Sequence, residues 1–171
     1  MGLLTLNESQ LKSYLLEWFG KDFIIKTEVE GKFLVDNTPV RIDYLMYPNE
    51  SLINKGFEKQ WFGVEVKTPG EDAKKGVQVS WQAITYSQSN FGGIRPAFVL
   101  IFPRLIDFFR CPSDGYYVST LLQKANVGSI TINERRRSWK ITFGANVYFY
   151  SDKGLSKTPT IATKRNVGSW K

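Results

Sequence analysis

The chain has 171 residues, a formal net charge of +7 and no histidine. Its length favours one domain with a sizeable core, and its positive charge favours a polyanionic partner such as nucleic acid. The lack of histidine excludes Ser-His-Asp and Cys-His catalysis, so any hydrolysis would depend on carboxylates, lysine, tyrosine and a hard metal ion.

The first predicted element is a helix that ends near Gly20. Thr5 and Glu8 have the spacing of a capping box, and an apolar stripe follows them. Strands are predicted over residues 23–29 and 32–35, as a pair around Glu30-Gly31, and then over 40–46 and 61–67. Residues 47–55 are expected to form a polar loop.

A second helix is predicted over residues 72–89. Val77, Trp81 and Ile84 follow i, i+4, i+7 spacing and are expected to face the core. The opposite face carries polar residues, namely Lys75, Gln78, Gln82, Tyr86 and Ser89. An apolar run over 97–102, closed by Pro103, predicts a buried central strand.

This order of elements predicts an α/β protein, a three-layer α/β/α sandwich with a mixed central sheet. Short helices are expected over 105–110 and 118–124, and strands over 129–132 and 139–150. We expect residues 1–150 to form a single domain and residues 151–171 to form a basic tail.

No apolar run approaches the ~18 residues that a membrane span requires, and the first residues lack the features of a secretory signal. The one cysteine, Cys111, excludes an internal disulfide and fits a reducing compartment. These features predict a cytoplasmic protein without a membrane partner.

Two predicted strands each contain a carboxylate among apolar neighbours. Asp43 lies in one, and the next carries Glu65 and Lys67, whose side chains should share a face because side chains alternate along a strand. This arrangement is suited to a divalent cation with an ammonium group beside it. The alternative is a set of ion pairs, Glu65–Lys67 or Arg41–Asp43, on a solvated sheet.

The following helix adds Gln82 and Tyr86, which lie one turn apart on one face. With these residues, positions 5–103 resemble the PD-(D/E)XK nuclease superfamily, which has a restriction-endonuclease-like fold. The Gln-x-x-x-Tyr motif is similar to that of the branch containing lambda exonuclease and the RecB-type nuclease domains. Ile42 stands where the family motif has proline, and the histidine that this branch often carries near its first helix is absent.

The resemblance implies that Asp43, Glu65 and the backbone carbonyl of Val66 bind Mg²⁺, with Mn²⁺ able to substitute. It implies that Lys67 orients or helps to deprotonate the attacking water. Gln82 and Tyr86 would brace the site or contact the scissile strand.

The family often adds an acidic residue from the first helix. Glu17 is the candidate here, and Glu28 on the first strand is its rival, whereas Glu8 is better explained as part of the cap. The resemblance also suggests, by analogy, a phage or mobile-element setting.

The sequence therefore predicts a metal-dependent nuclease that acts on nucleic acid, most readily DNA. Basic residues expected at the site edge are Arg41, Lys74, Lys75 and Arg95. One alternative is a catalytically silent module that binds nucleic acid or a partner protein, and another is a metal-free structural protein. Exonuclease or endonuclease action, DNA or RNA as substrate, and self-association are left open.

Overall fold

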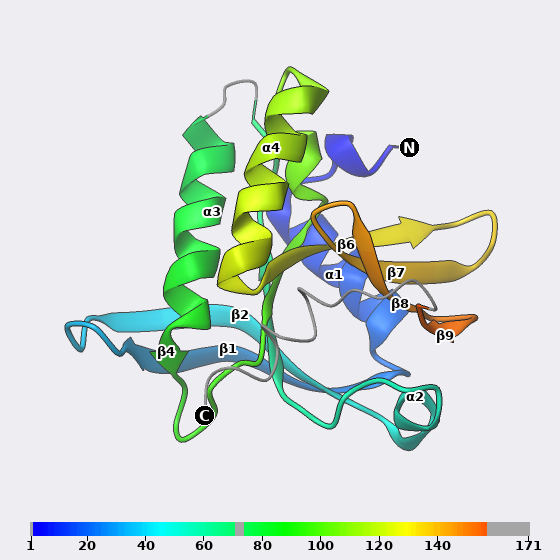
Figure 1. The fold of residues 1–171 in the computed structure, drawn as a ribbon, viewed down its shortest axis with the longest axis horizontal. Helices are drawn as coiled ribbons and strands as arrows, with labels where there is room; N and C mark the ends of the chain where they lie inside the picture. The colour runs from blue at the N-terminus through cyan, green and yellow to red at the C-terminus, as the bar shows by residue number, and fades with distance from the viewer. Residues whose placement is uncertain (1, 71–73, 157–171) are drawn as a thin grey trace.

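A computed structural model of the chain describes residues 2–70 and 74–156 (Figure 1). In these residues the strands are β1 (Phe23–Phe33), β2 (Pro39–Pro48), β3 (Phe62–Val66), β4 (Ser89–Asn90), β5 (Val99–Phe102), β6 (Val127–Asn133), β7 (Ser138–Phe143), β8 (Asn146–Tyr150) and β9 (Gly154–Leu155). They form one sheet in the order β4-β1-β2-β3-β5-β6-β7-β8-β9. The central pairs β3–β5 and β5–β6 are parallel and the other pairs are antiparallel, which confirms a mixed α/β fold with a mixed sheet.

The helices of the described residues are α1 (Glu8–Phe19), α2 (Glu50–Asn54), α3 (Lys74–Ser87) and α4 (Pro112–Leu122), with 3₁₀ turns η1 (Leu3–Thr5), η2 (Leu105–Phe108) and η3 (Gln123–Ala125). Helices α3 and α4 lie side by side in Figure 1, with α1 behind them. No helix in residues 2–70 and 74–156 has the length and apolar character needed to cross a membrane.

Two separate clusters of buried side chains make up the core. Helix α1 packs Leu11 and Leu15 into the first cluster, which also contains Val64 and Val66 of β3. Helix α3 packs into the second cluster. Because side chains alternate along a strand, Glu65 between the two valines faces away from the first cluster.

The N-cap of the first helix lies two residues later than expected. Asn7 is the N-cap: its Oδ1 accepts a hydrogen bond from the Gln10 amide at 2.9 Å, and the Gln10 side chain accepts one from the Asn7 amide at 2.9 Å. The capping box predicted for Thr5 and Glu8 is therefore wrong. Asparagine and threonine are both favourable N-cap residues, so the spacing of residues alone did not show which of Thr5 and Asn7 caps the helix.

The first strand is one continuous element. Residues 23–29 and 32–35 do not form a pair around Glu30-Gly31, because β1 runs through them and pairs with β2 from Phe23↔Pro48 to Lys32↔Pro39. The turn lies beyond Phe33 instead. The expected loop 47–55 contains α2, whose N-cap Asn49 accepts from the Leu52 amide at 3.0 Å.

The later elements also differ from expectation. Helix α4 begins at Pro112, several residues before the predicted 118, because proline is well tolerated in the first turn of a helix. The single strand expected over 139–150 is divided into β7 and β8 by a turn at Gly144, which has φ +58°. Part of the expected tail pairs as β9 with β8. Residues 157–171, and the predicted helix start at Asp72, lie outside the described residues.

The predicted core face of α3 is only partly correct, because Ile84 packs against the second cluster as expected but its two companions do not. Val77 and Trp81, expected in the core, are 49% and 68% exposed. Small residues face inward instead, including Gly76, where an added Cβ would lie 2.8 Å from the ring of Phe109. Such close packing against the body of the protein leaves no room for a tryptophan on that face.

The capping assignment can be tested by mutation. We expect Asn7→Ala to lower the free energy of unfolding by about 1 kcal/mol, because it removes a side-chain acceptor from the first turn of α1. Thr5→Ala is the matched control and should change the free energy by less than about 0.5 kcal/mol. Denaturant unfolding measures both, and an equal loss in Thr5→Ala would contradict the assignment.

Candidate active site

The antiparallel pairing of β2 with β3 brings two carboxylates together. Tyr44 pairs with Val64, so Asp43 and Glu65 lie across from each other at the next position of the ladder. They are only 8% and 5% exposed. The Val66 amide donates a hydrogen bond of 2.8 Å to Oδ2 of Asp43, which holds that carboxylate against β3. The structure therefore brings the predicted acidic pair together.

Glu65 is held in an environment that disfavours its charge. Its Oε2 is buried and has no hydrogen-bond partner among the described residues. Burial, and then the negative charge of Asp43, raise the pKa of Glu65 to about 8. A buried carboxylate of this kind favours either a proton or a nearby cation.

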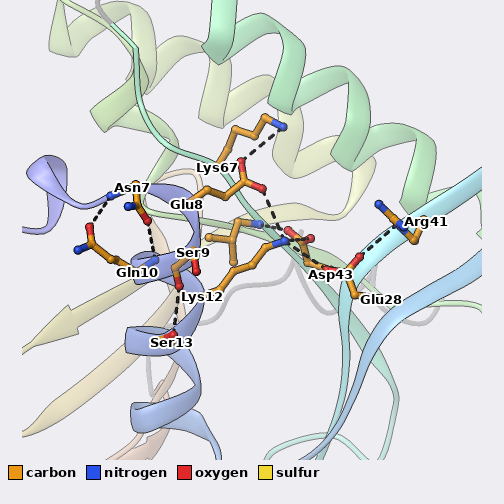
Figure 2. A network of polar contacts seen from close by, with 11 residues as sticks. Asn7, Glu8, Ser9, Gln10, Lys12, Ser13, Glu28, Arg41, Asp43 and Lys67 are labelled. Carbon is orange, nitrogen blue, oxygen red and sulfur yellow. Dashed lines mark hydrogen bonds and ion pairs between the residues drawn. The ribbon is translucent and has the colours of Figure 1, made fainter.

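A lysine from α1 supplies one cation. Nζ of Lys12 lies 2.6 Å from Oδ1 of Asp43 and 3.3 Å from Oε1 of Glu28 (Figure 2). Burial opposes the charged form of Lys12, but these contacts outweigh burial and raise its pKa above the ordinary value. The sequence analysis missed Lys12, because only the packing of α1 against the sheet brings it to Asp43.

Glu8 joins the two lysines of the site. Its carboxylate lies 3.5 Å from Nζ of Lys12 and 3.8 Å from Nζ of Lys67 (Figure 2). Its i, i+4 spacing from Lys12 was the available signal, since it places both residues on one side of α1. The first-helix carboxylate at this site is therefore Glu8, which the sequence analysis had assigned to a cap.

The structure does not bring Glu17 to this site. It is exposed, and at about two and a half turns from Glu8 it lies on the opposite side of α1. Glu28, the alternative candidate, does lie at the site, because its carboxylate pairs with Lys12. Glu28 has φ +49°, a left-handed conformation that is uncommon for residues other than glycine and often marks functional positions.

Helix α3 adds the two predicted polar residues. Oε1 of Gln82 is buried without a hydrogen-bond partner among the described residues. Tyr86 is buried one turn further on, and burial, followed by the charges of Glu65 and Asp43, raises the pKa of its hydroxyl. The hydroxyl therefore stays protonated and can act as a hydrogen-bond donor beside the carboxylates.

The predicted basic residues differ in their relation to the site. Arg41 lies at its edge, with Nε 3.1 Å from Oε2 of Glu28. Lys74 and Lys75 are exposed at the start of α3, and Lys74 lines a surface hollow together with Lys67. Arg95 is exposed in the turn after β4, and no ion pair within residues 2–70 and 74–156 joins it to the carboxylates.

The donor atoms at this site fit a hard divalent cation. Asp43 and Glu65 supply carboxylate oxygens, one of them buried without a partner. Within the described part of the chain, no three acidic, cysteine or histidine side chains are arranged to hold a metal. Mg²⁺ keeps several water ligands and needs only one or two protein carboxylates, so a pair is sufficient. The carbonyl of Val66 as a third ligand remains a prediction.

The chain matches no protein-family model, no curated protein and no solved structure.

The raised pKa of Glu65 predicts how stability changes with pH in metal-free solution. The folded protein holds this proton more tightly than the unfolded chain, where the pKa is near its ordinary 4.5. The resulting stabilisation is complete below pH 4.5 and is lost as the pH rises toward about 8.

Glu65→Gln cannot ionise and should not show this decrease. Denaturant unfolding in EDTA measures the free energy of unfolding of the wild type and of Glu65→Gln. The difference between the two free energies should change by up to about 1.4 kcal/mol per pH unit between pH 4.5 and about 8. Parallel pH profiles for the two proteins would contradict the assignment.

Proposed function

We propose that the protein is a metal-dependent nuclease that hydrolyses phosphodiester bonds, most readily those of DNA. The observation that carries this proposal is the cross-strand pair of buried carboxylates, Asp43 and Glu65, with Lys67 two residues further along. Two carboxylates that can hold a metal ion, with an ammonium group beside them, are suited to metal-assisted attack on a phosphate.

The order of elements supports the same proposal. Helix α1, strands β1 to β3, helix α3 and strand β5 follow each other as in the core of the PD-(D/E)XK superfamily, interrupted only by the short α2 and β4. The distribution of α1 and α3 between two core clusters is consistent with a three-layer α/β/α sandwich of the restriction-endonuclease-like type. We propose this fold for the chain.

Asp43 and Glu65 would hold Mg²⁺ or Mn²⁺. When bound, the metal would lower the pKa of a water molecule and neutralise negative charge on the phosphate. Lys67 supplies a further positive charge at the same edge of the sheet, and Glu8, at 3.8 Å, orients its ammonium group. This pairing holds the ammonium in place before substrate arrives.

Gln82 and Tyr86 would position the scissile strand. The protonated hydroxyl of Tyr86 can donate to a phosphate oxygen or to a carboxylate, and the amide of Gln82 offers both a donor and an acceptor. Neither adds charge to the site. Their role is therefore orientation, whereas Lys67 stabilises the charge that develops on the phosphate.

The surrounding charge is consistent with a nucleic-acid substrate. The chain carries a net charge of +7. Arg41 pairs with Glu28 at the site, Lys74 lines a hollow together with Lys67, and Lys75 and Arg95 are exposed. Contacts of this kind bind phosphates without reading base sequence, so binding should weaken as salt is raised.

The nuclease proposal predicts that Glu65→Ala and Lys67→Ala each lose cleavage by about a hundredfold or more, because each removes a charge that acts in the transition state. The assay compares linear and circular DNA, single- and double-stranded, in Mg²⁺, Mn²⁺ or EDTA. Resistance of circles would identify an exonuclease.

The chain provides its own matched control. Glu30-Gly31-Lys32 repeats the Glu-x-Lys spacing on an exposed part of β1, so Glu30→Ala should cut as the wild type does. Wild-type activity in folded Glu65→Ala would disprove the nuclease proposal.

One observation favours the alternative of a catalytically silent binding module. The ammonium of Lys12 lies 2.6 Å from Asp43, so the protein itself already supplies a positive charge to the acidic pair. In a silent module or a metal-free structural protein this ion pair would be permanent. In the proposed nuclease, Lys12 and the metal compete for Asp43.

This competition gives a prediction about metal affinity. Lys12→Met should bind Mn²⁺ about tenfold more tightly or better, because a charge-assisted hydrogen bond no longer has to be broken. Calorimetric titration measures the affinity without relying on activity. Lys21→Met, just beyond the C-terminal end of α1, is the control and should bind as the wild type does. Absence of Mn²⁺ binding in both the wild type and Lys12→Met would favour the silent or structural alternative.

A further inference from the structure

Helix α3 carries a second stripe that points to solvent. Its inward face consists mainly of small residues, whereas Lys74, Val77 and Trp81 follow i, i+3, i+7 spacing on an outward face. Trp81 is 68% exposed and Val77 49%. The indole ring of Trp81 is therefore accessible to a ligand.

This stripe continues into the candidate active site. A surface hollow of about 660 Å³ is lined by Lys67, Lys74, Val77, Gln78, Trp81 and Gln82. The same hollow therefore contains the indole ring, the ammonium of Lys67 and Gln82 from the predicted motif. A molecule that lies on Trp81 would share this hollow with the ammonium of Lys67 and with Gln82.

We propose that Trp81 forms a stacking site for an unpaired base of single-stranded nucleic acid, next to the phosphate held at Lys67. This inference rests on the proposed function because it takes nucleic acid as the ligand. An aromatic face accepts any base by stacking, and the neighbouring lysines complement the phosphates on either side of that base. In a continuous duplex the faces of the bases are covered, so the site should select single strands or frayed ends.

The composition of the hollow argues against a second protein chain as its occupant. Among the described residues that line it, only Val77 and Trp81 are apolar, and they lie between lysines and glutamines. A stable protein interface buries roughly 800 Å² on each partner and has an apolar centre. Two side chains surrounded by ammonium and amide groups suit one base with its phosphates better.

The test is a binding titration of the full-length chain with labelled oligo-dT and with a duplex of equal length. EDTA is present to prevent cutting. Trp81→Ala should bind oligo-dT about tenfold more weakly, as expected for the loss of one stacked base, and should bind the duplex as before. Trp81→Phe should retain most of the affinity because it keeps an aromatic face.

Tyr117→Ala is the matched control. Tyr117 is 64% exposed on the neighbouring helix α4 but does not line the hollow, so its removal should change nothing. Unchanged binding of oligo-dT by Trp81→Ala, or an equal loss in Tyr117→Ala, would overturn the inference. The inference would also be overturned if the wild type were a dimer and Trp81→Ala were a monomer that binds oligo-dT as the wild type does.

Cleavage assays on the same proteins separate this inference from the nuclease proposal. If the wild type cuts DNA and Trp81→Ala binds oligo-dT normally, the stacking site is wrong and the nuclease remains. If the wild type binds without cutting and Trp81→Ala weakens oligo-dT binding, the stacking site is supported in a silent module. If the wild type neither cuts nor binds nucleic acid, both proposals fail.

Discussion

Two carboxylates buried across from each other on β2 and β3 repel one another, and the rest of the site compensates for that repulsion. Asp43 accepts a backbone hydrogen bond and pairs with the ammonium of Lys12, whereas one oxygen of Glu65 has no hydrogen-bond partner in the part of the chain that the structure describes. Burying like charges is unfavourable unless a proton, a lysine or a metal neutralises them. A fold maintained only for stability gains nothing from this arrangement, and this is why the pair supports a functional interpretation.

The two sides of the sheet contribute differently to the site. Helix α1 supplies Glu8 and Lys12, and Glu8 in turn orients Lys67. Helix α3 supplies neutral polar groups and an exposed tryptophan. In the proposed nuclease, the charged side would hold the reacting phosphate and the α3 side the nucleotide that carries it. This division follows from the small residues that α3 packs inward beside Tyr86, an arrangement that leaves Val77 and Trp81 exposed.

The ion pair between Lys12 and Asp43 is compatible with both a nuclease and a binding module. An ammonium at 2.6 Å from Asp43 compensates part of the negative charge without any metal, so the site is stable in its absence. In a nuclease this lysine would make metal binding competitive and would limit cutting at low metal concentration. In a binding module the same contact would be permanent.

The sequence by itself determined the strands that carry Asp43 and Glu65, the mixed α/β class and the buried strand near residue 100, because alternation and apolar runs are local signals. Element boundaries were less certain wherever two residues could cap or turn equally well, as Thr5 and Asn7 show. Only the tertiary structure decided that Lys12 and Glu8 enter the site, that Glu17 does not, and that Trp81 faces solvent. The physical reason is that helical spacing shows which residues share a face, whereas the packing of α1 and α3 against the sheet determines which face turns inward.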